Sequence, residues 1–338
     1  PVQNVLDLCL ECKACKTECP SHVDMAKLKA ETLFQYQEKH GYSFRSRLFG
    51  FIGKINRFSS SFASLFNFLS GTKFFKFFFN LIGISKKRNL PKLAKKRFST
   101  LFKNYPQPKG KQVLLFNDTF NEFNNPEIGI SAVKVLNHLG YEVVTLPWEC
   151  CGRPMISKGF LKQAKAQALK LYNQLLPFAE KNIPIIGLEP SCILAIQDDF
   201  SSLIGKEKME LIVSCCFTFD SFIAKQNLKH FKTFSAPIKI HGHCHQKSLI
   251  GMKPTFDIFK KLHIQAEEID SGCCGMAGSF GYEKEHYDIS MKIGSLKLFP
   301  AIKDNTPLIA NGTSCRAQIQ DGTGTFAKHL AEFLSNLI

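Results

Sequence analysis

Acidic residues are missing from one long stretch of this sequence, because residues 45–111 contain no Asp or Glu. The same stretch holds sixteen of the 44 Lys and Arg residues, so the rest of the chain carries 28 basic and 28 acidic residues. The formal charge of +16 therefore belongs to one segment of an otherwise neutral protein. A charge confined in this way excludes a protein that coats nucleic acid over its whole surface.

The sequence also lacks a secretory leader pattern and an apolar run long enough to span a bilayer. Its longest apolar run, residues 74–84, is interrupted by Lys76. Cysteine, in contrast, is abundant: there are 13 in 338 residues, and most of them lie in motif-like groups. In a long chain without a leader, such groups favour reduced cytosolic thiolates that hold metal over disulfides.

The four cysteines nearest the N-terminus have the spacing of a ferredoxin. Cys9, Cys12 and Cys15 are three residues apart, and Cys19 follows four residues later, directly before Pro20. In two-cluster bacterial ferredoxins the first three cysteines hold one [4Fe-4S] cluster, and the cysteine before proline ligates the other. We therefore interpret this run as half of a two-cluster module and expect its partner run upstream. Zinc is the less favoured alternative, because four cysteines this close rarely form a closed structural zinc site.

The chain divides into three zones. Residues 1–42 combine the cysteine run with a predicted helix at 25–39, which we expect Ser21 to cap and Gly41 to end. Residues 43–111 form the basic zone, with thirteen Phe between Phe49 and Phe102. Residues 112–338 alternate short apolar runs with amphipathic ones, which predicts an α/β fold with parallel sheets. The predicted strands are 113–116, 143–146, 183–187, 238–241 and 308–310, and the clearest predicted helices are 130–139 and 161–179.

The last zone contains an internal repeat, with expected units at 112–233 and 234–338. A Cys-Cys-Gly motif at Cys150 recurs 123 residues later at Cys273. In each copy another cysteine, Cys192 or Cys315, follows 41 residues after the second cysteine of the pair. Each follows a predicted strand, so a parallel sheet would place the thiols at its carboxyl edge, where α/β folds bind ligands.

The two units offer different numbers of ligands. The second offers four thiolates, enough for an iron–sulfur cluster or a tetrahedral metal. These are Cys244, Cys273, Cys274 and Cys315. The first offers Cys150, Cys151 and Cys192, with Asp118 or Glu189 as the candidate fourth ligand, or it is degenerate. Adjacent cysteines fit tetrahedral zinc poorly, so a multi-iron cluster is favoured for the Cys-Cys-Gly motif.

Several motifs together carry a family resemblance. They are the cysteine run at 9–20 with its following helix, ECCGR at 149–153, GLEPSC at 187–192, HGHCHQK at 241–247, SGCCGMAGSFGYEKEH at 271–286 and DGTG at 321–324. This combination resembles the C-terminal iron–sulfur part of bacterial FAD-linked oxidase fusion proteins of the D-lactate dehydrogenase type. More distantly it resembles the iron–sulfur subunits of glycolate oxidase and glycerol-3-phosphate dehydrogenase and the cysteine-rich subunit of heterodisulfide reductase. The resemblance covers nearly the whole chain and is weakest in residues 43–111.

The resemblance implies an electron-transfer role. An FAD-binding dehydrogenase domain or subunit, absent from this chain, would oxidise a 2-hydroxy acid such as D-lactate or glycolate. This chain would pass the electrons through [4Fe-4S] clusters to a quinone or a cytochrome-linked acceptor, and no catalytic residue within it is implied. The heterodisulfide reductase likeness leaves a thiol reductase open, with the Cys-Cys-Gly cluster as its reaction centre. Those relatives have one further cysteine, where this chain has Glu189 and Gly312. A zinc scaffold without activity is a third reading.

Other conspicuous residues have plainer interpretations. Cys215 and Cys216 lie in a predicted apolar helix at 211–224 and are expected to pack in the core. The histidines at 241, 243 and 245 could ligate metal, carry a proton or hydrogen-bond to cluster sulfurs. The glycines at 275, 278 and 281 suit close approach of backbone to a cluster. Glu283, Glu285 and His286 are expected to begin a solvated helix.

The basic zone leaves three interpretations. Interleaved Phe and Lys or Arg could bind single-stranded nucleic acid, form amphipathic helices on an anionic membrane, or make a helical linker packed on its neighbours. We favour membrane docking through residues 44–103, since iron–sulfur carriers commonly deliver electrons to quinones. The expected location is the cytoplasmic face of the inner membrane, peripherally bound and without nucleic acid.

Overall fold

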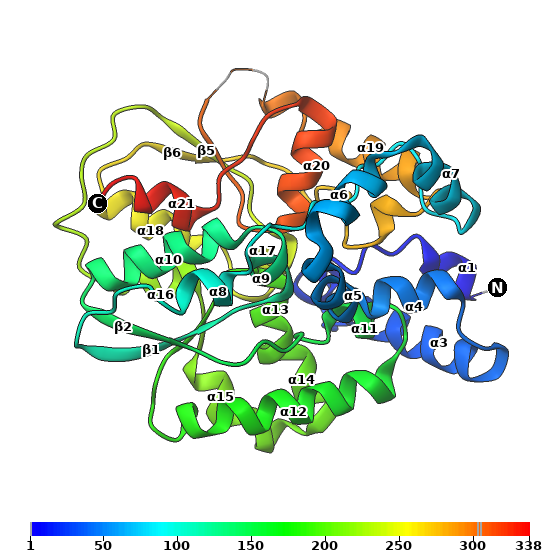
Figure 1. Cartoon of the computed structure of the whole chain (residues 1–338), viewed down its shortest axis with the longest axis horizontal. Helices are drawn as coiled ribbons and strands as arrows, with labels where there is room; N and C mark the ends of the chain where they lie inside the picture. Colours follow the sequence, from blue (N-terminus) through cyan, green and yellow to red (C-terminus); the bar gives the residue numbers. More distant parts are fainter. Residues whose placement is uncertain (1, 303, 305) are drawn as a thin grey trace.

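The computed structural model describes residues 2–302, 304 and 306–338. Two parallel sheets, with strand orders β2-β1-β3-β4 and β6-β5-β7, form its centre (Figure 1). The strands are β1 (Lys111–Phe116), β2 (Tyr141–Thr145), β3 (Ile185–Gly187), β4 (Cys216–Thr218), β5 (Ile238–Ile240), β6 (Ala266–Glu268) and β7 (Leu308–Ile309). The predicted fold class, α/β with two parallel-sheet units, is confirmed.

The two sheets correspond strand by strand. β1 lies between β2 and β3 just as β5 lies between β6 and β7, and β4 is an extra edge strand of the first sheet. Buried residues of both sheets, such as Val113, Ile186, Ile240 and Ile309, belong to one continuous hydrophobic core. The units therefore pack against each other, and their equivalent strand ends can be compared directly.

Helices cover both sheets. The predicted helices at 130–139 and 161–179 are confirmed as α10 (Pro126–His138) and α12 (Leu161–Ala179). The others after β1 are α9 (Thr119–Phe123), α11 (Arg153–Ser157), α13 (Pro190–Leu194), α14 (Phe200–Ile204), α15 (Lys206–Cys215), α16 (Phe219–Ile223), α17 (Cys244–Leu249), α18 (Lys253–Lys261), α19 (Tyr287–Leu296), α20 (Thr313–Thr323) and α21 (Leu330–Ser335). α21 of the second unit packs on α10 of the first.

The sequence-based predictions of one helix and of one helix cap are wrong. The expected helix at 211–224 is instead α15, the strand β4 and α16, because Cys216 enters a ladder opposite Ile185 and gains hydrogen bonds that apolar content alone does not reveal. The cap of α3 (Met25–His40) is Asp24 rather than Ser21. The Asp24 Oδ1 atom accepts hydrogen bonds from the Ala26 and Lys27 N–H groups, each at 3.1 Å.

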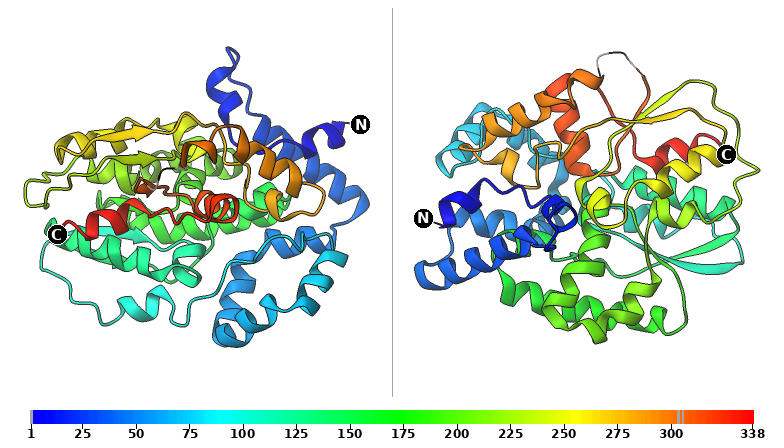
Figure 2. Two further views of the ribbon diagram at one scale, coloured as in Figure 1. Left: turned by 90° about the horizontal axis from the view of Figure 1, so that it is seen from above. Right: turned by 180° about the vertical axis from the view of Figure 1, so that it is seen from behind.

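The N-terminal zone and residues 44–81 of the basic zone are largely helical and lie beside the sheets, at the end of the molecule where the N-terminus is marked, whereas the rest of the basic zone runs along the first sheet (Figure 2). Their helices are α1 (Val2–Asp7), α2 (Ala14–Glu18), α3, α4 (Phe44–Gly50), α5 (Ile52–Ser59), α6 (Ala63–Gly71), α7 (Lys73–Leu81) and α8 (Phe98–Phe102). The basic zone is anchored by Arg88, which is 2% exposed and donates to the Gly281 carbonyl at 2.9 Å and to Asp321 at 2.7 Å. Among the described residues, no helix is long and apolar enough to cross a bilayer.

Candidate metal centres

Four thiols of the second unit meet at the carboxyl ends of its three strands; we call this site two. Cys244 opens α17 after β5, Cys273 and Cys274 follow β6, and Cys315 lies in the first turn of α20 after β7. The hydrogen bond with Cys273 and burial raise the pKa of the Cys244 thiol well above its ordinary value. Cys274 in turn contacts Cys273 and Cys315. Four sulfurs that contact one another in series, two of them buried and two half-buried, form a donor set for soft metal ions.

Three thiols of the first unit meet in the same way; we call this site one. Cys150 and Cys151 follow β2, and the Cys192 Sγ atom in α13 lies 3.0 Å from the Cys151 Sγ atom. The hydrogen bond with Cys151 and burial raise the pKa of Cys150 well above its ordinary value. Site one therefore reproduces three of the four sulfurs of site two.

Thr119 takes the place of the fourth cysteine in site one. It is the first residue of α9 after β1, as Cys244 is the first residue of α17 after β5. Its hydroxyl lies beside the Cys150 thiol, as the Cys244 thiol lies beside Cys273. The sequence places residues 116–119 at the equivalent strand end but does not single out Thr119, because its offset from Cys244 is 125 residues, whereas the cysteine repeat has an offset of 123. Aligning the two units by the first residue of α9 and of α17 would have paired Thr119 with Cys244.

The candidate fourth ligands Asp118 and Glu189 are already engaged. The Asp118 Oδ1 atom caps α9, accepting from the Phe120 and Asn121 N–H groups at 2.9 and 3.1 Å, and its other oxygen accepts from the Asn121 amide. Burial and the nearby Glu189 carboxylate raise the pKa of Asp118 to about 6. Glu189 crosses to the second unit, where its Oε2 atom accepts from the Thr313 N–H at 2.8 Å.

A glycine follows each cysteine pair for a backbone reason. Gly152 and Gly275 have φ angles of 78° and 92°, in the left-handed region that glycine favours. This turn lets the Gly152 N–H point at the Cys150 Sγ atom, and the Gly275 N–H at the Cys273 Sγ atom, each at 3.5 Å. A Cβ atom at Gly275 would also lie 2.4 Å from the Ser290 carbonyl oxygen. N–H groups aimed at the sulfurs stabilise thiolates and tune iron–sulfur potentials.

The N-terminal cysteine loop has a matching arrangement. Burial raises the pKa of the Cys12 thiol, and the nearby thiols of Cys244 and Cys15 raise it further. Backbone N–H groups of Glu11 and Ala14 point at the Cys9 and Cys12 thiols. Cys19 lies apart from these three, with its thiol among the N–H groups of residues 21–23. The loop thus places the thiols of Cys9, Cys12 and Cys15 in one group, and the Cys19 thiol lies outside it.

This loop is docked between the two units. The His245 Nε2 atom bonds to the Glu11 carbonyl oxygen at 2.8 Å, on the site-two side. Arg153, 8% exposed and next to the first cysteine pair, donates to the Glu11 carboxylate at 3.0 Å. Its positive charge acts on both the Cys151 and the Cys244 thiols. Glu11 therefore joins the N-terminal loop to His245 of the second unit and to Arg153 of the first.

The three histidines of the 241–247 motif are buried, and burial lowers the pKa of each of them. His241 donates or accepts at the Ser271 hydroxyl through Nδ1 at 2.9 Å, while its Nε2 atom is buried without a partner among the described residues. One of its ring nitrogens lies within 4.8 Å of the Cys274 and Cys315 sulfurs. Burial lowers the pKa of His241 to about 3. His241 is thus placed to hydrogen-bond to a sulfur or to ligate a metal at site two.

The further cysteine position of the heterodisulfide reductase type cannot be filled in site two. A Cβ atom on Gly312 would lie 2.4 Å from the His243 Cδ2 atom and 3.1 Å from the Cys315 Sγ atom. His243 occupies that space and caps α17. Any cluster at site two is therefore limited to the four cysteines and the neighbouring histidines.

Cys215 and Cys216 belong to neither site. Both are buried in the core around β3 and α12, with 6% and 3% exposure. Burial raises the pKa of the Cys216 thiol, and the only other influence on it is the adjacent Cys215 thiol. Within the described part of the chain, these two cysteines serve packing.

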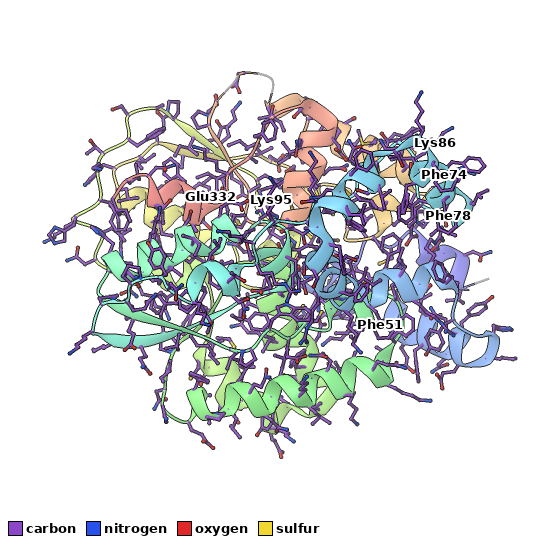
Figure 3. All side chains as sticks on the ribbon, in the orientation of Figure 1. Phe51, Phe74, Phe78, Lys86, Lys95 and Glu332 are labelled. Carbon is purple, nitrogen blue, oxygen red and sulfur yellow. The ribbon has the colours of Figure 1, made fainter. Side chains whose placement is uncertain are left out.

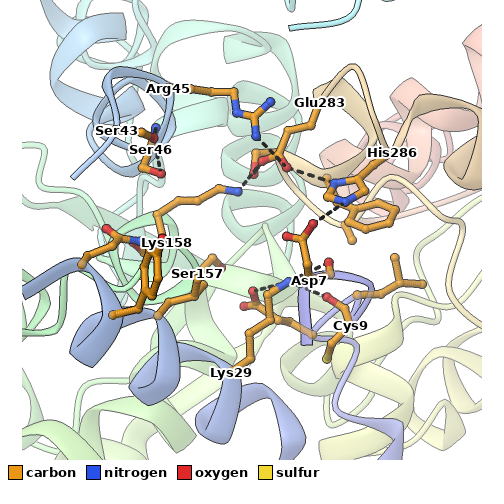
Figure 4. Close-up of a pocket in the computed structure, with 18 of the residues that line it drawn as sticks. Asp7, Cys9, Lys29, Ser43, Arg45, Ser46, Ser157, Lys158, Glu283 and His286 are labelled. Carbon is orange, nitrogen blue, oxygen red and sulfur yellow. Dashed lines mark hydrogen bonds and ion pairs between the residues drawn. The ribbon is translucent and has the colours of Figure 1, made fainter. Parts of the chain in front are cut away.

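A polar cavity of about 230 Å³ lies where the three zones meet, beside Cys9 (Figure 4). His286 bonds to the Glu283 carboxylate at 3.0 Å and to the Asp7 carboxylate at 2.9 Å. Burial opposes its protonation, but these two carboxylates raise the pKa of His286 to about 9. Glu283 also pairs with Lys158. A helix, α19, does begin here after His286, and Glu285 is exposed as expected. The expectation of solvated side chains is wrong for Glu283 and His286, which are 4% and 3% exposed in an ion-pair network.

The donor sets fit iron–sulfur clusters. Their thiols are grouped beside backbone N–H groups, and the raised pKa values reflect sulfurs that repel one another as thiolates, a repulsion that bound cations relieve. Iron and sulfide would bind at three places: the N-terminal loop, site one and site two. The thiols that would hold them are Cys9, Cys12 and Cys15 in the loop, Cys150, Cys151 and Cys192 in site one, and Cys244, Cys273, Cys274 and Cys315 in site two. Cys19 would be left to ligate a cluster held together with another segment.

Comparison with known proteins gives one family model and several relatives. The model of the cysteine-rich domain CCG matches residues 117–197 and 251–320. D-2-hydroxyglutarate dehydrogenase of Escherichia coli is 25% identical over 370 residues, covering 100% of this chain and 35% of that protein. One subunit of the anaerobic glycerol-3-phosphate dehydrogenase of Escherichia coli is 26% identical, covering 75% of this chain and 67% of that protein. Lactate utilization protein A 1 of Bacillus mycoides is 25% identical, covering 62% of this chain and 91% of that protein.

The match to this D-2-hydroxyglutarate dehydrogenase covers all of this chain but only about a third of the length of the dehydrogenase. The two segments matched by the family model contain the cysteine pairs together with Thr119, Cys192 and Cys315.

Proposed function

We propose that this chain, which carries two cysteine-rich domains of the CCG type, is the iron–sulfur electron-transfer part of an FAD-linked dehydrogenase. The donor would be a 2-hydroxy acid, as the names of the relatives acting on 2-hydroxyglutarate and lactate suggest. FAD and the oxidation of the substrate belong to a domain or subunit outside this chain. The acceptor is a quinone or a cytochrome-linked carrier.

One observation supports this function above the others: the N-terminal cysteine loop is held against both cysteine-rich units, because Glu11 bonds to His245 of the second unit and to Arg153 of the first. The Cys244 thiol is close enough to Cys12 to raise the pKa of the Cys12 thiol. The positive charge of Arg153 interacts with the thiols of both Cys151 and Cys244. Iron–sulfur clusters bound to these thiols would supply one-electron transfer. Contiguous sites suit that role, since the protein's contribution is to set spacing, burial and hydrogen bonding.

The chain's own residues then have defined parts. The loop at 9–15 would receive electrons from the flavin side, and the two strand-end sites would pass them on. Arg153 places a buried positive charge between the sites, which favours the reduced state of a neighbouring cluster. The N–H groups of Gly152 and Gly275 act in the same direction on their own sites.

Anaerobic purification followed by metal analysis and EPR of the dithionite-reduced protein tests the function. We expect iron and acid-labile sulfide in near-equal amounts, with EPR signals of reduced clusters that disappear on oxidation. Stoichiometric zinc with no iron and no visible absorbance would contradict the proposal and favour a scaffold. Turnover of a heterodisulfide substrate by the chain alone would favour the thiol reductase.

We also propose that the basic zone docks the protein on an anionic membrane surface. Its helices α5, α6 and α7 expose a series of large apolar side chains, and Phe74 and Phe78 lie at the outer end of the molecule near Lys86 (Figure 3). The exposed series is Phe58, Phe62, Leu65, Phe68, Phe74, Phe77, Phe78 and Leu81. Apolar side chains flanked by lysines bind the interface of anionic bilayers. This would place the protein at the cytoplasmic face of the inner membrane, near its acceptor.

Replacing Phe74, Phe77 and Leu81 together with serine should abolish this docking. All three are at least 61% exposed, so their replacement leaves the core intact while removing apolar area from the interface. Co-flotation with vesicles containing phosphatidylserine or phosphatidylglycerol should fall at least tenfold. The matched control is Phe326→Ser, equally exposed at 76% but in the second unit. Equal flotation of wild type with neutral and anionic vesicles would contradict docking through this surface.

A further inference from the structure

We propose that site one binds its cluster through only three protein thiolates and leaves the iron nearest Thr119 open to a small exogenous ligand. This inference rests on the proposed iron–sulfur function and concerns which atoms of the chain reach the cluster. The ligand class is a donor of one or two atoms other than hydrogen, such as water, hydroxide or cyanide. Site two, with its fourth thiol, is the built-in comparison.

The equivalence of the two sites carries the first step. In both units the fourth position is the first residue of the helix that follows the central strand, β1 or β5. Site two has a thiol there, which contacts Cys273. Site one has the Thr119 hydroxyl, which lies beside Cys150. A neutral hydroxyl is a far weaker ligand for iron–sulfur clusters than a thiolate.

No other described side chain replaces the missing thiol. Both carboxylate oxygens of Asp118 already accept hydrogen bonds from residues at the start of α9. Glu189 is held by the Ser191 hydroxyl at 2.8 Å and by the Thr313 N–H at 2.8 Å. Moving either carboxylate to site one would uncap a buried helix end. The three-thiol count therefore follows from the contacts as well as from the sequence.

The Thr119 hydroxyl itself is unsatisfied. Thr119 is 3% exposed, and its Oγ1 atom has no hydrogen bond of normal geometry to any described residue. A buried hydroxyl without a partner costs free energy unless a ligand or water completes it. A small ligand on the neighbouring iron would accept a hydrogen bond from Thr119 or donate one to it.

The surroundings restrict the ligand to a small size. Gly53 of α5 covers this position, since a Cβ atom there would lie 3.2 Å from the Thr119 Oγ1 atom and 3.1 Å from the Trp148 Cζ2 atom. Trp148 adds a second buried polar atom without a described partner, its indole N–H. Helix α5 of the basic zone therefore covers the Thr119 side of site one at close range, which suits a ligand of one or two atoms other than hydrogen.

The test uses the Cys12→Ala background, which removes the other three-thiol site of this chain. When a [4Fe-4S]²⁺ cluster loses one iron as Fe²⁺ and gives one electron to ferricyanide, a [3Fe-4S]⁺ cluster remains and ferricyanide is reduced. A cluster held by three thiolates should undergo this change readily, so mild oxidation of Cys12→Ala should give the [3Fe-4S]⁺ EPR signal. Adding Thr119→Cys should reduce that signal at least fivefold and retain the iron. Thr119→Ser, which keeps the hydroxyl, is the matched control and should leave the signal unchanged.

A second measurement does not require the Thr119→Cys substitution. Cyanide added to reduced Cys12→Ala protein should shift the EPR spectrum of one cluster, because it can occupy the open position. An unchanged [3Fe-4S]⁺ signal in Cys12→Ala/Thr119→Cys, or no response to cyanide in Cys12→Ala, would overturn the inference while leaving the proposed function intact. Complete absence of iron from the wild-type protein would overturn both.

Discussion

Replacing Cys274 with alanine is expected to remove the cluster of site two, a loss of about four iron atoms per chain. Cys274 contacts both Cys273 and Cys315 and is 3% exposed, so no solvent ligand can substitute for its sulfur without rearrangement. The measurement is iron and sulfide per chain after anaerobic reconstitution, together with EPR of the reduced protein. The signals of the N-terminal loop and of site one should persist.

The matched control for this experiment is another buried cysteine. Cys215 is 6% exposed and lies in the core of the first unit, where its Sγ atom donates to the Ala179 carbonyl oxygen at 3.8 Å rather than to a sulfur of either site. Cys215→Ala should therefore leave the iron content unchanged, although it removes a thiol of similar burial. Equal iron in Cys274→Ala and wild type would show that the sulfurs gathered at site two do not hold a cluster.

Replacing Lys13 with methionine is expected to lower the free energy of unfolding by about 3 kcal/mol. Lys13 is 1% exposed, and its Nζ atom lies 2.5 Å from Asp198 and 2.6 Å from Asp199. A π-helical turn, Ala195–Asp199, presents these two successive carboxylates to it. Burial alone would raise the pKa of Asp198, but the Lys13 ammonium holds it well below its usual range. Without Lys13, buried carboxylate charge would lose its main partner.

Urea unfolding at neutral pH measures this effect, and Lys27→Met is its control. Lys27 approaches the same Asp198 carboxylate at 3.4 Å but is 34% exposed, so its loss should cost less than about 1 kcal/mol. Because Lys13 adjoins Cys12, the variant should also release iron from the N-terminal loop faster than wild type under a chelator. Equal stability of the Lys13 and Lys27 variants would show that this ion-pair cluster does not fasten the loop.

Much of the fold could be predicted because local patterns and tertiary structure agree. The helix at 161–179 has the predicted bounds, since its buried residues Ala164, Ala168, Leu171 and Leu175 recur at helical spacing. The short strands β1, β3 and β5 were visible as apolar runs. β4 was not, because its three residues lie inside a longer apolar run and are distinguished from it only by their ladder with β3.

The sequence by itself determined which cysteines are candidate ligands. Their spacings predict the donor sets, since ligand number and order are covalent properties of the chain, and the charge count isolates the basic zone. The tertiary structure decided which residues surround each set. Thr119 stands where Cys244 stands in the other unit, Glu189 caps a helix of the neighbouring unit, and His286 is buried between two carboxylates. These relations join residues far apart in the chain through the packing of two sheets, and no local pattern encodes that packing.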